Sequence, residues 1–532
     1  MQASRWFCSA MLTGIGLLLL CRCANPGALT GGPKDTIPPQ VVKRIPPLGQ
    51  TNFKSQEVSI TFNEPVRSKN LQQELIITPR LQEKDAYEII EKKYSIILRF
   101  KKPLLENTTY SIHFRNGIVD ATEGNAAQEA MIVFSTGAQL DSLQVGGTCT
   151  QALSGESIEN ALVGLYPAHD SIDPALHEPL YLTKTNNKGQ FRLQFVKAGS
   201  YQLFAIDDQN NNGKWDKTEL LGFLPEALSL QNSIDSLYIE LVPQDVKAPQ
   251  IVGKRASGQY AYTVITFNEG IDSCHLQPAL PFVLDKSGRI LKLYHRDSLE
   301  VQITARDSTG NLLHDTLQLA APQGKEKEKF EVDISESYQA YTQELQLKIH
   351  ANKPIARQVD SLFYAYIDQD TLNKQLFARA YFQQPTPNRL VFKQKIDFRD
   401  SAKIFIDKGW LISIEEDSSQ TQWIKKVNRA NPKEFATLRL YIEKKEGERW
   451  IMQLLNKENK VIQEHKVGSE PIEIKGLPPG EYKLRFFQDS NANGRWDSGN
   501  YKEKILHEKI FIYNKALRLK ANWEVEERLV IE

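Results

Sequence analysis

Cysteine and histidine are scarce in this sequence. Three of the five cysteines fall within the first 23 residues, so that only Cys149 and Cys274 remain for the rest of the chain. This excludes a framework of disulfide bonds, and we expect both residues to be small buried apolar side chains. The nine histidines show neither H-x-H nor HExxH spacing, so nothing supports a zinc site or a metalloprotease.

An excess of charge of one sign is also missing. The chain has 66 basic and 65 acidic residues and a formal net charge of +1. Such a chain produces no long-range field that would attract nucleic acid, and we predict no nucleic-acid partner. The motifs G-x-S-x-G, Walker A and G-x-G-x-x-G are absent as well, which excludes the easily recognised hydrolases and nucleotide enzymes. We therefore predict a protein that is not an enzyme, and we infer no small-molecule substrate.

Long apolar runs are missing too, apart from one near the N-terminus. The segment from Ser9 to Leu20 follows Arg5 and is too short to span a bilayer, so residues 1–22 are predicted to be a secretory signal. Residues 23–36 are rich in Pro and Gly and predict a flexible tether.

The cysteines at the end of this segment make it resemble a bacterial lipoprotein signal. In such signals the first mature residue is a cysteine that carries diacylglycerol and a further acyl chain such as palmitate. We assign this role to Cys23; Cys21 is the alternative, because Arg22 departs from the small residue normally found before the acylated cysteine. Several acyl chains together give stable membrane anchoring. A plain secretory signal with incidental cysteines is the competing interpretation.

Alternation of apolar and polar residues dominates the remainder of the chain. In "EVSITF", Val58, Ile60 and Phe62 are separated by polar side chains, which is the period of a half-buried strand. The same period recurs at Ile96, Leu98 and Phe100; Tyr110, Ile112 and Phe114; Phe191, Leu193 and Phe195; Leu237, Ile239 and Leu241; Leu345, Leu347 and Ile349; and Leu438, Leu440 and Ile442. Short strands separated by turn residues predict an all-β chain of β-sandwiches.

Internal repeats predict how these sandwiches are organised. "DTIPPQVV" at 35–42 recurs as "DVKAPQIV" at 245–252, each followed by "ITFNE", and "GSYQLFAIDDQNNNGKWD" at 199–216 matches "GEYKLRFFQDSNANGRWD" at 480–497. Glu64 and Glu269 of the "ITFNE" repeats are interpreted as turn residues rather than catalytic acids. The predicted modules are an Ig-like domain at 37–137, a loop-bearing sandwich at 138–243, a second Ig-like domain at 244–324, a third at 325–420, and a second loop-bearing sandwich at 421–532.

The residues of the first two modules resemble known families. "CANPGALTGGPKDTIPPQVV", "ITFNEPV" and "LLENTTYSIHF" resemble the S-layer-type bacterial Ig-like domain at the start of a group of Bacteroidota lipoproteins. "ALVGLY" and "GQFRLQFVKAGSYQLFAIDD" resemble the prealbumin-like or carboxypeptidase-regulatory-like sandwich, which is non-catalytic. The resemblance implies an anchored envelope protein of the outer membrane. Acids after the lipidated cysteine accompany surface export in related lipoproteins, and "CANPG" has none, which favours the periplasmic face.

The first acidic loop has the ligand spacing of a calcium-binding loop. From Asp208 as position 1, the pattern D-x-[DN]-x-[DN]-G-x5-E places oxygen ligands at Asp208, Asn210, Asn212, the Lys214 carbonyl, Asp216 and Glu219. A strand precedes the loop where an EF-hand has a helix, so this is not an EF-hand domain. The competing interpretation is an Asn- and Asp-rich turn in which Gly213 supplies a positive φ. We predict a structural Ca²⁺.

The second loop repeats this pattern less completely. Its predicted ligands are Asp489, Asn491, Asn493, the Arg495 carbonyl and Asp497. Position 12 is Asn500, which cannot provide the bidentate carboxylate.

Two functions fit these observations. The first is a non-catalytic, lipid-anchored envelope protein that acts as a structural spacer or a protein-interaction scaffold, with calcium-stabilised loops. The alternative is a surface lipoprotein that binds glycans through the C-terminal third, which holds Trp410, Trp423, Trp450 and Trp523. Triplets of Asp, Ser or Thr, and an apolar residue resemble acceptor sites of O-glycosylation in the same bacterial group; examples begin at Asp35, Asp141, Asp235 and Asp360.

Overall fold

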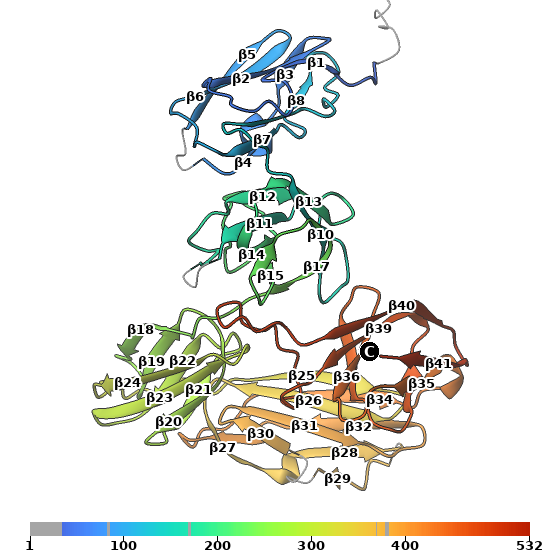
Figure 1. The fold of residues 1–532 in the computed structure, drawn as a ribbon. Helices are drawn as coiled ribbons and strands as arrows, with labels where there is room; N and C mark the ends of the chain where they lie inside the picture. The colour runs from blue at the N-terminus through green and yellow to red at the C-terminus, as the bar shows by residue number, and fades with distance from the viewer. Residues whose placement is uncertain (1–34, 82–85, 169–171, 369, 378–381, 532) are drawn as a thin grey trace, which may run out of the picture. The chain divides into compact units, whose positions relative to one another are not determined.

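A computed structural model describes residues 35–81, 86–168, 172–368, 370–377 and 382–531 (Figure 1). Cys21, Cys23 and the predicted signal peptide lie outside these residues. Within them the chain is almost entirely β, as predicted; the helical segments are α2 (Leu71–Glu74), η1 (Asp360–Leu362) and η3 (Pro432–Glu434). None of the helices described is long and apolar enough to cross a membrane. The chain divides into two compact units, the first comprising residues up to Gln144 with 180–182 and 193–198, and the second the remainder.

In the first module the predicted apolar positions are buried, but Ser111 between Tyr110 and Ile112 is buried as well, so that strand is not half-buried. The strands of this module are β1 (Val41–Ile45), β2 (Glu57–Phe62), β3 (Val66–Ser68), β4 (Ile76–Thr78), β5 (Tyr87–Lys92), β6 (Ser95–Phe100), β7 (Thr109–His113), β8 (Ile118–Asp120) and β9 (Met131–Ser135). They form the sheets β1-β2-β6-β5, β4-β7-β9 and β3-β8. Ile60 and Ile96 face each other across β2 and β6, and both are fully buried in one hydrophobic core.

The second module forms one sheet with strand order β12-β11-β14-β15-β17-β10-β13, to which β16 is added beside β14. Its strands are β10 (Leu143–Gln151), β11 (Leu162–Pro167), β12 (Tyr181–Lys184), β13 (Gln190–Val196), β14 (Gly199–Ile206), β15 (Leu220–Phe223), β16 (Leu228–Leu230) and β17 (Ile234–Pro243). The predicted alternation fails at Phe195, which has φ +59° and is only partly buried. The left-handed conformation breaks the period of two, and Val196 is buried in its place.

The third module begins like the first. Its strands are β18 (Ile251–Ala256), β19 (Tyr262–Phe267), β20 (Ile271–Gln277), β21 (Phe282–Leu284), β22 (Ile290–Tyr294), β23 (Leu299–Asp307) and β24 (Leu312–Leu319), in sheets β18-β19-β22-β21 and β20-β23-β24. Asn268 of its "ITFNE" accepts a hydrogen bond from Gln250 N at 2.7 Å, and Asn63 does the same for Gln40 N at 2.7 Å in the first module. The repeated asparagine thus ties the end of one strand to the start of its neighbour.

The fourth module packs two four-stranded sheets around an aromatic core. Its strands are β25 (Val332–Gln339), β26 (Glu344–Ala351), β27 (Ile355–Gln358), β28 (Phe363–Ile367), β29 (Gln375–Leu376), β30 (Phe382–Thr386), β31 (Arg389–Lys395), β32 (Ser401–Ile406), β33 (Leu411–Ser413) and β34 (Trp423–Asn428), in sheets β25-β26-β31-β30, β29-β28-β32-β34 and β27-β33. Because β34 pairs with β32, this module continues past residue 420. Lys353 is fully buried, with Nζ 2.6 Å from Glu415 Oε2 and 2.7 Å from Asp417 Oδ2.

The fifth module carries the second acidic loop. Its strands are β35 (Ala436–Glu443), β36 (Trp450–Leu455), β37 (Val461–Lys466), β38 (Ile472–Leu477), β39 (Gly480–Gln488), β40 (Ile510–Leu519) and β41 (Glu524–Val530), in sheets β37-β36-β39-β40 and β38-β35-β41. Leu438 and Leu440 are fully buried in its core, whereas Ile442 is partly buried against it.

Candidate metal centre

The first acidic loop joins two paired strands. It occupies residues 207–219, between β14 and β15, and Ile206 pairs with Leu221 at its base. The carboxylates at its two ends are nearly inaccessible, with Asp208 7% and Glu219 3% exposed, whereas residues 209–212 are exposed. The loop therefore buries two carboxylates at its base. Burying an ionised carboxylate costs free energy unless hydrogen bonds or an opposite charge replace the lost hydration.

Backbone N–H groups compensate part of that charge. Asp208 Oδ1 accepts from Asn212 N at 3.1 Å, and Oδ2 accepts from Gly213 N at 3.0 Å. Glu219 spans the loop: Oε1 accepts from Gln209 N and Oε2 from Asp216 N, each at 3.1 Å. Each carboxylate offers about four acceptor positions, so these bonds leave others free.

The middle ligands are drawn together at Asp216. Its Oδ2 accepts from Asn210 Nδ2 at 2.7 Å and from Asn212 Nδ2 at 2.9 Å. Asn212 Oδ1 in turn accepts from Lys214 N at 2.7 Å. The side chains predicted as ligands thus share one hydrogen-bond network, which is also the network of the competing Asn- and Asp-rich turn.

The electrostatics of Glu219 fit either interpretation of the loop. Burial raises the pKa of Glu219, and the charge of Asp208 raises it further. The backbone donors oppose this rise and do not cancel it. The loop therefore retains uncompensated negative potential, which a bound cation would relieve.

The second loop has the same network. Asp489 Oδ2 accepts from Gly494 N at 3.2 Å, and Asp497 Oδ2 accepts from Asn491 Nδ2 at 2.6 Å and from Asn493 Nδ2 at 2.9 Å. These bonds match those of Asp208 Oδ2 and Asp216 Oδ2 in the first loop, whereas the bond from Asn212 N to Asp208 Oδ1 has no counterpart at Asp489 Oδ1. The two segments are repeats in structure as well as in sequence.

Glu508 is the residue that the sequence reasoning missed. Asn500, at position 12 by counting, caps a separate turn, where its Oδ1 accepts from Lys502 N at 3.0 Å. Glu508 instead spans the loop: Oε1 accepts from Ser490 N at 2.6 Å and Oε2 from Asp497 N at 3.2 Å. Its backbone N donates to Asp497 O at 2.9 Å. These are the contacts that Glu219 makes in the first loop.

An insertion explains why counting failed. Residues 498–507 leave the second loop after Asp497 and return just before Glu508. Within them, Asn500 and Ile505 form an isolated bridge that closes the insertion on itself. The tryptophans mark the correspondence: Trp215 Nε1 donates to Glu219 O at 2.9 Å, and Trp496 Nε1 donates to Glu508 O at 3.1 Å. The spacing of residues in the sequence does not reveal this contact between the tryptophan N–H and the carbonyl of the spanning glutamate.

The insertion packs on the first loop within the second compact unit. The Tyr501 ring lies 5.2 Å from the Trp215 ring, and its hydroxyl donates to Asp173 Oδ1 at 3.1 Å. Gln244 Oε1 accepts a hydrogen bond from Tyr501 N at 3.2 Å, and Gln244 Nε2 donates one to Ser498 O at 2.7 Å. We call this contact the Tyr501 clasp. Tyr501 is 5% exposed, so it is a packed contact between the two loop-bearing modules.

A further acidic cluster lies beside the first loop. Asp245, Glu269 and Asp307 each place a carboxylate oxygen within 4.8 Å of the others, the one such group of acidic, His or Cys side chains in the part of the chain that is described. Lys217 Nζ lies 3.1 Å from Asp245 and 2.7 Å from Glu269. Lys217 already pairs with two of the three carboxylates, and Asp307 accepts hydrogen bonds from the backbone N–H groups of Thr309 and Asn311, so we assign this cluster no metal.

The remaining sequence candidates occupy structural positions. Burial raises the pKa of both Cys149 and Cys274 to about 12, so neither thiol is a nucleophile. Trp410 and Trp450 are 1% and 2% exposed, and Trp423 packs against the core of the fourth module. Trp523 is 46% exposed. Core packing thus accounts for most of the C-terminal tryptophans.

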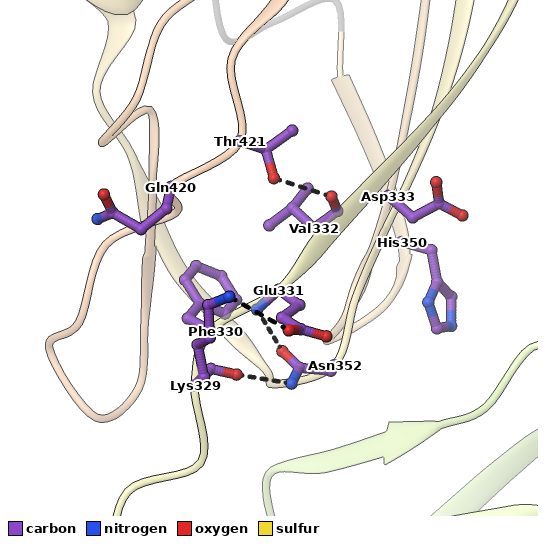
Figure 2. A pocket seen from close by; sticks show the side chains of 9 residues that line it. All are labelled: Lys329, Phe330, Glu331, Val332, Asp333, His350, Asn352, Gln420 and Thr421. Carbon is purple, nitrogen blue, oxygen red and sulfur yellow. Dashed lines mark hydrogen bonds and ion pairs between the residues drawn. The ribbon is translucent and has the colours of Figure 1, made fainter.

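A shallow groove of about 470 Å³ in the fourth module is shown in Figure 2. It is lined by Lys329, Phe330, Glu331, Val332, Asp333, His350, Asn352, Gln420 and Thr421. Asn352 accepts from Glu331 N and donates to Lys329 O, each at 2.8 Å, and Asp333 forms an ion pair with Lys286. Phe330 is 3% exposed. The groove offers no free aromatic face, and its carboxylates do not form a converging pair.

Comparisons with known proteins identify one module. Residues 35–136 match the model of a bacterial Ig-like domain, a small part of the chain that fits a structural, non-catalytic role. No curated protein matches the chain significantly.

Among solved structures, the major pilin subunit BcpA of Bacillus cereus is 11% identical, with 73% of this chain and 99% of that chain covered and a TM-score of 0.14. Domains 1–6 of the surface layer protein SbsC are 10% identical, with 91% and 68% covered and a TM-score of 0.15. An L,D-transpeptidase from Mycobacterium smegmatis is 14% identical, with 39% and 91% covered and a TM-score of 0.15. Scores this low support no argument about function.

Proposed function

We propose that this protein is a non-catalytic, lipid-anchored protein of the bacterial cell envelope that acts as a structural spacer or interaction scaffold, with calcium-stabilised loops. The observation that carries the proposal is the way its interior is filled. Four hydrophobic clusters each draw their residues from a single module, the first, third, fourth and fifth. A chain that divides its apolar residues among separate cores builds independent modules rather than one enclosed reaction chamber.

The polar groups support the same conclusion. Asp120 accepts hydrogen bonds from four backbone N–H groups at residues 122–125, and Lys353 balances Glu415 and Asp417. Acids held in this way fix turns and strands. A general acid or base needs instead a reachable proton position beside a substrate.

The lipid anchor rests on the N-terminal sequence, and a pair of variants tests it. Cys23→Ser is expected to leave an unacylated protein that separates from membranes on fractionation, because the acyl chains supply the attachment. Cys21→Ser serves as the matched control and should keep both the lipid mass and the membrane association. Intact mass spectrometry of native protein reads out the lipid directly. An unacylated native N-terminus would refute this part of the proposal.

The glycan-binding alternative retains one observation. Trp523 is exposed in the fifth module, with Lys520 Nζ 4.9 Å from its ring centre. A glycan array probed with wild type and Trp523→Ala separates the two functions. The spacer predicts no binding by either protein, whereas binding that depends on Trp523 would favour the alternative.

A further inference from the structure

We propose that the second loop is a complete divalent-cation site whose spanning carboxylate is Glu508, brought in from beyond the ten-residue segment 498–507, which stands where the first loop has only Lys217 and Thr218. The proposal rests on the calcium-stabilised loops proposed above and deepens them, since counting left this loop without its bidentate ligand. The site would take a hard cation with oxygen ligands, and we assign Ca²⁺.

An unpartnered buried oxygen points to the ligand. Asp489 is 5% exposed, and its Oδ1 has no hydrogen-bond partner, whereas Asp208 Oδ1 in the first loop is bonded to Asn212 N. Buried carboxylate oxygens are rarely left without a partner, because the loss of hydration is then uncompensated. The other oxygen of the same carboxylate accepts from Gly494 N, so the group is held within the loop. A cation in the loop would supply the missing partner.

The surrounding groups have the chemistry of such a site. Glu508 and Asp497 meet at the base of the loop, and the pKa of Glu508 is raised by burial and by the charges of Asp497 and Asp489. Three carboxylates and two amides thus belong to one hydrogen-bonded loop, with the Arg495 carbonyl as the backbone ligand of the repeat. The three carboxylates are not as close to one another as those of Asp245, Glu269 and Asp307, so a bound cation would draw them together. A flexible set of six or seven oxygens suits Ca²⁺, because Mg²⁺ requires a stricter octahedron and retains more water.

The number of calcium ions bound tests the assignment. Metal-free full-length protein in detergent is titrated with Ca²⁺ by calorimetry, for wild type, Glu508→Gln, Asn500→Ala and Asp208→Ala/Glu219→Gln. We expect two ions for wild type and for Asn500→Ala, and one ion for Glu508→Gln and for the first-loop variant. Combining the first-loop variant with Glu508→Gln should abolish binding. The amide introduced by Glu508→Gln keeps an acceptor for the Ser490 N–H, and circular dichroism checks that each variant is folded.

The two proposals fail in different ways. One ion in wild type that is lost in the first-loop variant would overturn the Glu508 site and leave the first loop standing. One ion that is lost in Glu508→Gln would do the reverse. Two ions in Glu508→Gln, or the loss of one in Asn500→Ala, would also overturn the assignment. If Glu508→Gln does not fold, Asp489→Asn replaces it, read out by terbium luminescence excited through Trp496; a signal equal to that of wild type would contradict the site.

Discussion

Removing the two buried carboxylates of the first loop should abolish its response to calcium. Asp208→Ala together with Glu219→Ala deletes the predicted ligands at positions 1 and 12, which lie at the base of the loop and are 7% and 3% exposed. Asp207→Asn is the matched control, because it removes an adjacent acid that is not a predicted ligand. The double variant also loses four hydrogen bonds from backbone N–H groups, so it should be less stable than wild type even without calcium.

The size of the calcium effect can be worked out from linkage. Extracellular calcium modules have dissociation constants of about 0.1 to 1 mM, and three carboxylates with two amides place this loop in that class. At 10 mM Ca²⁺ the free ligand is then roughly 10 to 100 times the dissociation constant, which stabilises the folded state by about 1.4 to 2.7 kcal/mol. For a cooperative unit of about 100 residues, the size of the second module, this raises Tm by roughly 6 to 22 °C.

Differential scanning calorimetry with EDTA and with 10 mM Ca²⁺ measures this shift. Wild type and Asp207→Asn should show it. The double variant should show only the part that belongs to the second loop, and Mg²⁺ at the same concentration should have less effect. If wild type shows no calcium-dependent shift at millimolar concentration, the interpretation of the loop as a metal site is refuted and the Asn- and Asp-rich turn stands.

Three other predictions concern single residues. Lys353→Met leaves two carboxylates without their cation and should cost about 3 kcal/mol in chemical denaturation, the low end of the range because both acids are partly exposed; an unchanged midpoint would contradict it. Burial raises the pKa of Asp120, but four backbone donors outweigh it and lower the pKa to about 2. Its stabilisation is therefore present above about pH 4 and lost as the pH falls toward 2, and an Asp120→Asn variant should lack this acid-dependent step in fluorescence-monitored unfolding. Tyr501→Ala removes a buried aromatic contact with Trp215 and should cost about 3 to 5 kcal/mol where the clasp is closed; faster proteolysis at 498–507 would report it, and unchanged protection would argue against the clasp.

The alternating segments named from the sequence all form strands, although they are a minority of the strands in the described structure. Val58, Ile60 and Phe62 are buried as expected, because the alternation of side chains along a strand is a property of the backbone itself. Phe195 departs from the predicted alternation because one residue in the left-handed conformation changes which face of the sheet the following side chains occupy. A hydropathy pattern does not show that a bulky residue adopts this conformation.

The two loops show where spacing stops being informative. In the first loop all the predicted ligands lie within twelve residues, so a sequence motif is enough to propose them. In the second, Glu508 lies eight positions beyond Asn500, and only the pairing of β39 with β40 brings it to the loop. Asp489 and Asp497 could be proposed from the sequence because they are close in the chain, whereas Glu508, which makes the contacts of Glu219, is placed by the sheet.

The Tyr501 clasp has a mechanical consequence for a tethered protein. The clasp joins the second and fifth modules directly, although two whole modules lie between them along the chain. If the proposed lipid anchor holds the N-terminus, a pull between it and a partner bound to the fifth module would pass across the clasp and bypass the third and fourth modules. The third and fourth modules would then bear no force until the clasp has opened. The molecule would extend first by opening the clasp, before any sandwich unfolds.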